Sequence, residues 1–398
     1  MKMPGEVWRR NQWVMGLMVF VVFAAFAFVM PFLPLFVREL GIEGDSDIAL
    51  WAGILIGVSP LLAGLMAPIW GRLADSTGQK PVALKALGVY AVILVLSALV
   101  GNVWELLALR VGIGLFGGIG PLGLAMATAG APREETGRIV GRIQAAQMLS
   151  TAGSPFVGGL LADTLGIRAT FLVTAAFCLA AFALVAIAYR EPVREGARDG
   201  VVKRIRFRDV VGRRGIPTLL AVFFLVSFVG RSFTPILPLH LALLGVDPGR
   251  LGMATGILVT AYSAAAALSA TLSGSATRRF EPKRLLAWSL LAGAATVLPI
   301  AKAPSFALVL CLAVALGLVS GGALTLCYTL GGHAVPQELR TTAFGVFASA
   351  TLFGGAVAPT VAGLLSRLDL RAIYVADAAI FAGLGVFLLV GRRRELVT

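Results

Sequence analysis

The chain has 398 residues, of which 58% are hydrophobic and 14% charged, and its mean hydropathy is +0.90. One soluble core cannot bury so much apolar surface, so the composition excludes an ordinary soluble domain and indicates a membrane protein. The net charge of +14 could suggest nucleic acid as a partner. Nearly all Lys and Arg residues lie between or beyond the apolar segments, however, so we expect no nucleic-acid binding.

Twelve apolar segments approach the length of about 20 residues that crosses a hydrocarbon core of roughly 30 Å. They lie near residues 13–37, 50–70, 81–100, 104–128, 139–161, 169–189, 216–240, 252–273, 285–301, 306–330, 342–365 and 372–390. The sequence therefore predicts an all-α membrane protein with twelve transmembrane helices. The first segment is too long for the apolar region of a signal peptide, so we expect it to be the first span.

The two halves of the chain resemble each other at an offset of about 204 residues. Pro-Phe-Leu-Pro-Leu at 31–35 recurs as Pro-Ile-Leu-Pro-Leu at 235–239, and Pro155 and Gly159 recur as Pro359 and Gly363. Such a repeat predicts two pseudo-symmetric six-helix bundles. We place them at residues 1–189 and 216–398, joined by a basic cytoplasmic linker at 190–215. Small residues spaced by three and four on the second, fifth, eighth and eleventh segments predict close packing between the halves.

The basic residues predict the orientation. If both termini lie on one side, that side carries 26 Lys and Arg residues against six on the other. The positive-inside rule then places both termini and the linker in the cytoplasm, in a bacterial-type inner membrane. The three cysteines fall inside predicted spans, so we expect neither a disulfide framework nor a metal site.

Residues 71–80 read Gly-Arg-Leu-Ala-Asp-Ser-Thr-Gly-Gln-Lys. We expect the glycines Gly71 and Gly78 to permit a tight turn after the second span, and the Asp75 carboxylate to latch neighbouring helix ends through its charge. This pattern resembles the signature of the major facilitator superfamily at every strong position. The resemblance implies that Gly71, Asp75, Gly78 and Lys80 control the conformational state.

Ionisable residues inside spans are candidates for proton coupling. Arg110 lies inside the fourth segment, where a charge should face a wet cavity or a partner, unless the side chain extends to the outer interface. Arg110 followed by Gly114 resembles the second motif of the superfamily, in which the arginine is tied to proton coupling. We expect either Glu105 together with Arg110, or Asp377, to exchange protons, although Glu105 could equally be an interfacial residue.

The fifth segment carries a run of small residues around a proline: Gly141, Ser150, Ser154, Pro155, Gly158 and Gly159. Their spacing resembles the antiporter motif of drug:proton exchangers, with serine at two glycine positions. A kinked and tightly packed helix would explain the same residues. With residues 30–37, these motifs resemble the twelve-helix drug:proton antiporter branch. The resemblance implies a central cavity that opens alternately to each side of the membrane, and no bound cofactor.

The candidate cavity residues are aromatic or polar: Phe28, Phe32, Gln144, Phe228, Arg231 and Tyr328. Aromatic walls suit planar or amphipathic compounds, although such side chains more often pack or face lipid. Arg231 requires a carboxylate, a substrate or water, and Gln144 could equally join two helices.

We therefore expect a monomeric, proton-coupled exporter of small amphipathic or hydrophobic compounds, whose partners are its substrate, protons and the bilayer. Export of a lipid-like or sugar-like metabolite, or uptake by symport, would use the same fold and motifs. A membrane-embedded enzyme or receptor is disfavoured, because His240 and His333, the two histidines, fall at opposite membrane faces. A primary pump is also disfavoured, because the sequence contains no phosphate-binding Gly-x-x-x-x-Gly-Lys-[Ser/Thr] motif.

Overall fold

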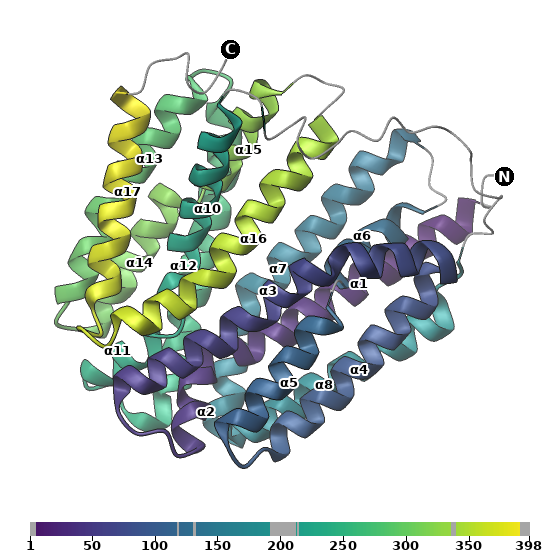
Figure 1. The fold of residues 1–398 in the computed structure, drawn as a ribbon, viewed down its shortest axis with the longest axis horizontal. Coiled ribbons are helices and arrows are strands. Elements are labelled where there is room, and N and C mark those ends of the chain that lie inside the picture. The colour runs from purple at the N-terminus through teal and green to yellow at the C-terminus, as the bar shows by residue number, and fades with distance from the viewer. Residues whose placement is uncertain are drawn as a thin grey trace. The chain divides into compact units, whose positions relative to one another are not determined.

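The computed structural model describes residues 5–390 except 118, 130–132, 192–211, 213–214 and 336–339. These residues form helices joined by short connections, and no strand occurs among them (Figure 1). In the first half of the chain the helices are α1 (Gly5–Val29), η1 (Met30–Phe32), α2 (Leu33–Glu39), α3 (Asp45–Thr77), α4 (Gln79–Leu99), α5 (Val103–Leu115), α6 (Ile119–Thr128), α7 (Arg133–Leu165) and α8 (Ile167–Ala188). In the second half they are α10 (Ile216–Ser232), α11 (Leu237–Leu243), η2 (Pro248–Arg250), α12 (Leu251–Ala276), α13 (Pro282–Val297), η3 (Leu298–Lys302), α14 (Phe306–Ser320), α15 (Ala323–Ala334), α16 (Arg340–Leu365) and α17 (Ala372–Val390).

All twelve predicted segments coincide with helices. Among the described residues, nine stretches are long and apolar enough to cross a membrane, and ten if α10 and α11 form one bent span. The predicted fourth and fifth segments are not among them. The fourth is divided into α5 and α6, of 13 and 10 residues, and the fifth lies in the more polar helix α7. The multi-pass helical fold is therefore confirmed, and the count of twelve stays a prediction.

The chain forms two compact units. The first contains residues 1–41, 58–200 and 249–257, and the second contains 42–57, 201–248 and 258–398. Helix α3 thus belongs to the second unit up to Gly57, and α12 belongs to the first unit up to Ile257. The division into bundles at 1–189 and 216–398 stays a prediction, and most of the predicted linker lies outside the described residues.

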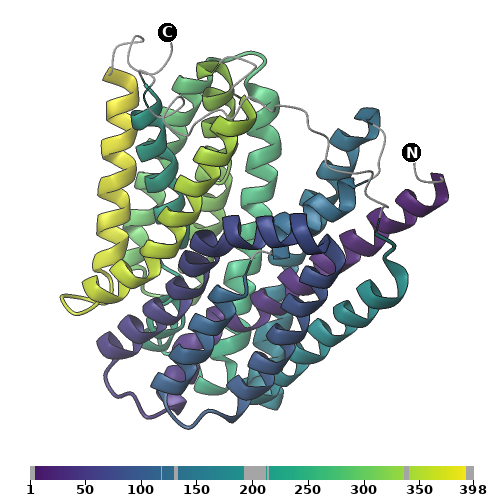
Figure 2. The same ribbon diagram turned by 45° about the vertical axis from the view of Figure 1, so that its right-hand side comes forward.

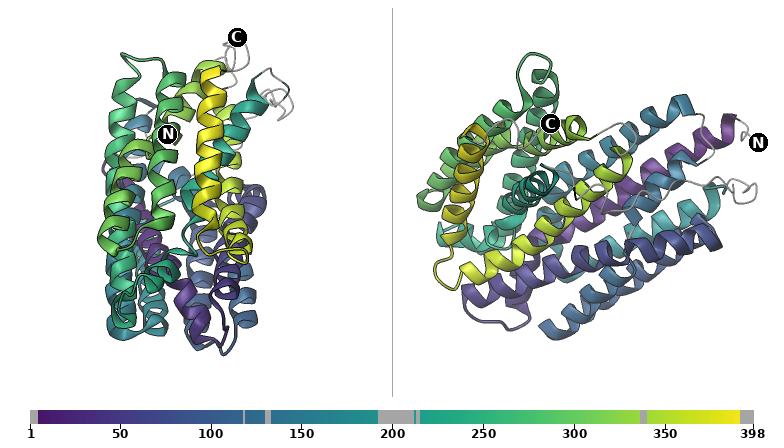
Figure 3. Two further views of the ribbon diagram at one scale, coloured as in Figure 1. Left: turned by 90° about the vertical axis from the view of Figure 1, so that its left-hand side faces the viewer. Right: turned by 45° about the horizontal axis from the view of Figure 1, so that its top comes forward.

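Each unit is a bundle of packed helices. In the first, α1 packs against α6, α7 and α8, and α4 packs against α5 and α8 (Figure 2). In the second, α10 packs against α15 and α16, and α13 packs against α14 and α17, the yellow helix in Figure 3. Large apolar side chains such as Trp13, Ile187 and Val390 are mostly exposed on the outside. Exposed apolar surface of this kind suits lipid rather than water.

Two close helix contacts fall at matched positions of the repeat. In the first unit, a Cβ atom on Gly256 would overlap with the Pro155 backbone, and in the second, one on Gly53 would overlap with the Pro359 backbone. The next turns repeat the pattern, because Gly159 meets the backbone of Gly252 and Gly363 meets that of Ala49. Small residues allow these backbones to touch. The close packing predicted for the small-residue stripes is confirmed, and its assignment to a seam between the halves stays a prediction.

Candidate transport site

The segment that carries the superfamily signature is mostly helical. Helix α3 continues to Thr77, so Gly71 lies inside it and the predicted two-glycine turn is wrong. The hydroxyls of Ser76 and Thr77 donate to the Leu73 carbonyl, at 3.0 and 2.8 Å, in the last turn of this helix. Gly78 alone makes the turn, with φ of 103°, a value that side chains other than glycine rarely adopt.

Lys80 joins this turn to the end of α8. Its ammonium group donates to the carbonyls of Ala186 and Tyr189, at 2.8 Å each. A cation at the C-terminus of a helix satisfies carbonyls that have no intrahelical partner and complements the helix dipole. Glu191 completes the junction, because its carboxylate accepts from the Gln79 amide at 2.5 Å. Burial and the nearby Glu191 charge raise the pKa of Tyr189. Asp75 lies in α3 with its side chain outside the described part of the chain, so its latch role stays a prediction.

Arg110 is a buried cation in the first unit. Its side chain is 1% exposed, with Nη1 4.0 Å from the Met30 sulfur and Cζ 5.8 Å from the centre of the Phe171 ring. Its Nε and Nη2 atoms have no hydrogen-bond partner among the described residues. The Ser59 hydroxyl donates to its backbone carbonyl at 2.7 Å. Three guanidinium donors without a strong acceptor, in an apolar site, define a place where water or an anionic group would be stabilised.

Glu105 does not join Arg110. It lies in the first turn of α5, exposed, and its two carboxylate oxygens accept from the Gly101 amide at 2.8 Å and the Asn102 side chain at 2.7 Å. Asn102 in turn caps α5 by accepting from the Glu105 amide at 3.0 Å. This reciprocal arrangement is a helix start of the capping-box type. The hypothesised Glu105–Arg110 pair is therefore absent from the described structure.

The residues of the antiporter-type motif divide into two groups. Pro155, Gly158 and Gly159 are buried, and a Cβ atom on Gly158 would overlap with the Phe28 backbone. Ser150 and Ser154 are also buried. The Ser150 hydroxyl donates to the Gln147 carbonyl, and the Ser154 hydroxyl donates to the Ser150 carbonyl, both within α7. Gly141, more than two turns before Ser150 on α7, is exposed, and so is the cavity candidate Gln144 on the same helix. The motif thus holds α7 against α1 and the start of α12, and its role in antiport stays a prediction.

The aromatic cavity candidates are mostly packed inside their units. Phe28 and Phe32 are 5% and 0% exposed, and Phe228 is 7% exposed. Tyr328 is half-buried, with its ring 4.8 Å from Phe223 and edge-on to it. These positions favour packing for the three phenylalanines and leave Tyr328 as the more accessible candidate.

Arg231 and Asp377 are linked in the second unit through Ser232, the residue that follows Arg231 on α10. Arg231 is exposed. Its Cγ atom packs against Gly355, because a Cβ atom added to that glycine would lie 3.4 Å from it. Asp377 is 0% exposed, and its Oδ2 atom accepts from the Ser232 hydroxyl at 2.5 Å. Tyr262 lies within electrostatic range of both. The second unit therefore holds a buried carboxyl on α17 whose hydrogen-bond donor on α10 directly follows an accessible cation.

Several residues of these sites escaped the sequence analysis. Glu191, Ser232, Tyr262 and Tyr374 contribute through partners far away in sequence, as in the Ser232–Asp377 bond across 145 positions. Asp163 also accepts backbone hydrogen bonds from Gly252 and Met253, at 2.9 and 2.6 Å. An ionisable residue inside an apolar segment was the one available signal, and it pointed to Arg110 and Asp377 but not to their partners.

The bundles of apolar helices, with buried ionisable groups in their cores, define a multi-pass membrane protein of the transporter type. A sequence model described as Major Facilitator Superfamily matches the chain twice, over residues 15–258 and 219–397, so the chain belongs to that family.

Similar sequences and similar solved structures support this assignment. The chain is 29% identical to the multidrug resistance protein MdtG of Citrobacter koseri over 98% of both chains. It is 32% identical to MdtG of Yersinia enterocolitica over 74% of this chain and 71% of the relative. Among solved structures, a nucleoside transporter NupG mutant has a TM-score of 0.80 at 13% identity, covering 95% of this chain and 99% of that one. An inward-facing bacterial homologue of the lysosomal transporter Spinster has a TM-score of 0.77 at 17% identity, covering 97% and 96%. At these identities the structures support the fold alone.

Proposed function

We propose that this chain is a secondary transporter, not an enzyme, that exports small amphipathic or hydrophobic compounds in exchange for protons. The carrying observation is the similarity to multidrug resistance proteins over 98% of both chains, together with the superfamily signature and the antiporter-type helix α7. Among the described residues, the ionisable side chains buried inside these units include Arg110 in the first and Asp377 in the second. A buried ionisable group inside a span is costly and is a default candidate for proton or substrate handling.

The orientation and the partners follow from the same reasoning. Both termini lie in the cytoplasm of the inner membrane, because that side collects most of the Lys and Arg residues. Tyr328 and Arg231, the accessible candidates of the second unit, contact the substrate. The working unit is a monomer that needs no bound cofactor or metal.

Reconstitution in vesicles tests the function. An inward or outward pH gradient is imposed, and a panel of lipophilic cationic dyes, neutral drugs, lysolipids, nucleosides and sugars is added in turn. We expect cationic and neutral amphiphiles to dissipate the gradient, and protein-free vesicles to hold it. Dissipation by nucleosides or sugars but by no amphiphile would refute drug export and favour the metabolite alternative. Movement of a compound without any effect of the gradient would refute proton coupling.

A further inference from the structure

Two buried polar pairs join α17 to the span formed by α10 and α11. Ser232, the last residue of α10, donates to Asp377, and the Nδ1 atom of His240 in α11 lies 3.0 Å from the Tyr374 hydroxyl. His240 is 0% exposed and Tyr374 is 2% exposed. Tyr374 and Asp377 are three residues apart on α17, so they lie on the same face of that helix.

The two pairs lie on opposite sides of a break in the helix. Helices α10 and α11 are bent by 42° at residues 233–236. Pro235 within the break has no amide hydrogen, and Pro238 adds a second missing donor in the first turn of α11. Helix α17 therefore spans a hinge, with one polar pair on each segment that the hinge connects.

Asp377 is incompletely satisfied in this position. Its Oδ1 atom is buried and has no hydrogen-bond partner among the described residues. A carboxylate with one neutral donor is costly in an apolar interior, and a bound proton removes the charge. Oδ1 is therefore the atom at which the structure favours a proton.

Tyr262 on α12 and Tyr374 on α17 interact electrostatically with Asp377. Arg231 on α10 acts on Tyr262, and Arg371, just before α17, acts on Tyr374 and on His240 of α11. The short helix η3 packs against α17 as well and ends at the exposed Lys302. Helix α13 also packs against α17, in antiparallel fashion, since Gly293 meets Phe381 and Gly385 meets Leu291. Its basic residues Lys283 and Arg284 thus lie at the end of α13 away from Asp377.

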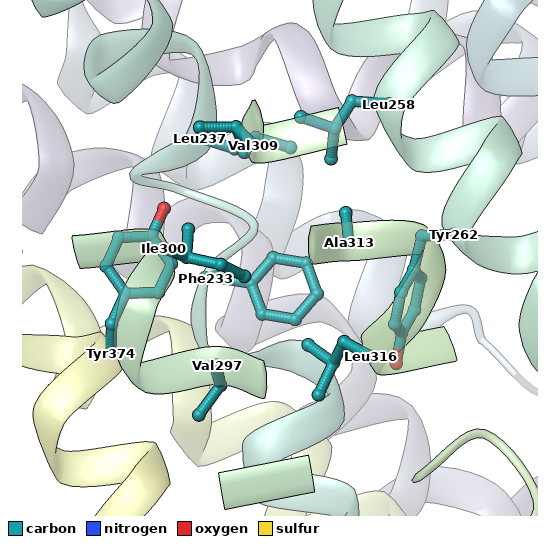
Figure 4. Close-up of a pocket in the computed structure, with 10 residues that line it drawn as sticks. All are labelled: Phe233, Leu237, Leu258, Tyr262, Val297, Ile300, Val309, Ala313, Leu316 and Tyr374. Atoms are coloured by element: carbon teal, nitrogen blue, oxygen red, sulfur yellow. The ribbon is translucent and has the colours of Figure 1, made fainter. Parts of the chain in front are cut away.

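A small cavity adjoins the hinge. It has a volume of about 20 Å³, and Phe233, the first residue of the break, lies between Tyr374 on one side and Tyr262 on the other (Figure 4). The remaining lining residues are aliphatic, with Ala313 of α14 the smallest. The space is about that of one water molecule. It gives the Phe233 ring room to shift when the hinge changes its angle.

We propose that Asp377 is a proton-binding site that sets the bend of the span Ile216–Leu243. One proton binds the carboxylate at Oδ1 to give the neutral acid, and the same proton leaves when the site opens to water. In the neutral state Ser232 and Tyr374 hold the two hinge segments as the structure shows. In the ionised state the carboxylate draws the Tyr262 and Tyr374 hydroxyls toward it, the His240–Tyr374 pair weakens, and α11 changes its angle to α10. As the coupling device of the proposed exporter, this mechanism rests on the proposed function, but proton binding and hinge motion can be measured without any transported compound.

The first experiment measures proton binding directly. Infrared difference spectra of the purified protein are recorded as a function of pH, and the carbonyl band of a protonated carboxyl is followed. We expect a band that titrates in the native protein, is lost in Asp377→Asn and is kept in Asp369→Asn, an exposed carboxyl in the turn before α17. Ser232→Ala removes one donor and should shift the midpoint of the same band. If Asp377→Asn does not fold, that shift decides the assignment. A native protein without a titrating band, or a band unchanged in these variants, overturns the proposal.

The second experiment measures the hinge. Nitroxide labels at Leu243 and Leu389, both exposed, are introduced in a background without the three cysteines. We expect the distance between the labels to change with pH, and to be independent of pH in Asp377→Asn. Ala313→Val fills the cavity beside Phe233 and should reduce the distance change while the infrared band persists. A distance independent of pH in the unsubstituted background overturns the hinge. If the band and the distance respond but no amphiphile dissipates a pH gradient, the exporter assignment fails and the proton site stands.

Discussion

Replacing Asp163 by alanine should loosen the start of α12. The carboxylate accepts from the amides of Gly252 and Met253, which lie in the first turn of the helix and have no intrahelical partner. Hydrogen bonds to a charged group contribute about 1.5–3 kcal/mol each, and a negative charge at a helix N-terminus adds about 0.3–1 kcal/mol. Asp163 is half-buried, so in the alanine variant water can bond to the two amides and recover part of this stabilisation. We expect a net local loss of about 2 kcal/mol, which corresponds to roughly 30-fold faster amide exchange.

The matched control lies in the second unit. Arg367 follows Gly363 by four residues, as Asp163 follows Gly159, and it pairs with Asp47 in the first turn of α3 at 3.1 Å. Both side chains are more than half exposed, at 56% and 53%, so this pair contributes at most about 1 kcal/mol. Hydrogen exchange of the peptides that cover residues 251–256 and 45–50 provides the measurement. Equal effects of Asp163→Ala and Arg367→Ala, or exchange in 251–256 unchanged by Asp163→Ala, would refute this reasoning.

Three further substitutions test the signature segment and the buried cation. Gly78→Ala places a Cβ at a φ of 103° and against the Glu191 carboxylate, so we expect a loss of about 1–3 kcal/mol in thermal or denaturant unfolding. Lys80→Met removes two hydrogen bonds at the end of α8, and faster exchange of the amides near Ala186, by about tenfold, is the expected readout. Arg110→Gln keeps an unbranched polar side chain but not the charge, and it should abolish pH-gradient-driven dye movement while dye exchange persists. Full gradient-driven movement in Arg110→Gln would remove Arg110 from the coupling.

The sequence sufficed for the helices and for where their backbones touch. Apolar length is a local property, and the spacing of glycines and prolines reports directly on which helix faces can approach. The small residues of the second and eighth segments were expected to allow close packing, and Gly53 and Gly256 on these segments do lie against neighbouring backbone. The predicted tight turn at Gly71 is wrong because a glycine permits a turn without requiring one, and α3 continues past it to Thr77.

Polar partners were harder to predict. A hydrogen bond between two helices depends on how each helix is rotated about its axis and shifted along it, and hydropathy encodes neither. Glu105 illustrates this limit. Its distance of five residues from Arg110 suggested a pair, yet its carboxylate bonds to the Gly101 amide at the helix start. Asp377 was identified as a buried acid, but the Ser232 partner and the neighbouring His240–Tyr374 pair became visible only when α17 was placed against the broken span.

The repeat explains why the second unit has room for a hinge. At an offset of 203 residues, the surroundings of Arg110 in the first unit correspond to the walls of the cavity in the second: Met30 to Phe233, Phe171 to Tyr374, and Arg110 itself to Ala313. The guanidinium fills this layer in the first unit, and alanine leaves about 20 Å³ open in the second. Backbone contacts between glycines and prolines tolerate no added atoms, which accounts for their recurrence in both halves. Side chains in the matched layer are under no such restriction, so one unit holds a fixed cation there, and the other has free space lined by Tyr374, one helical turn before the buried Asp377.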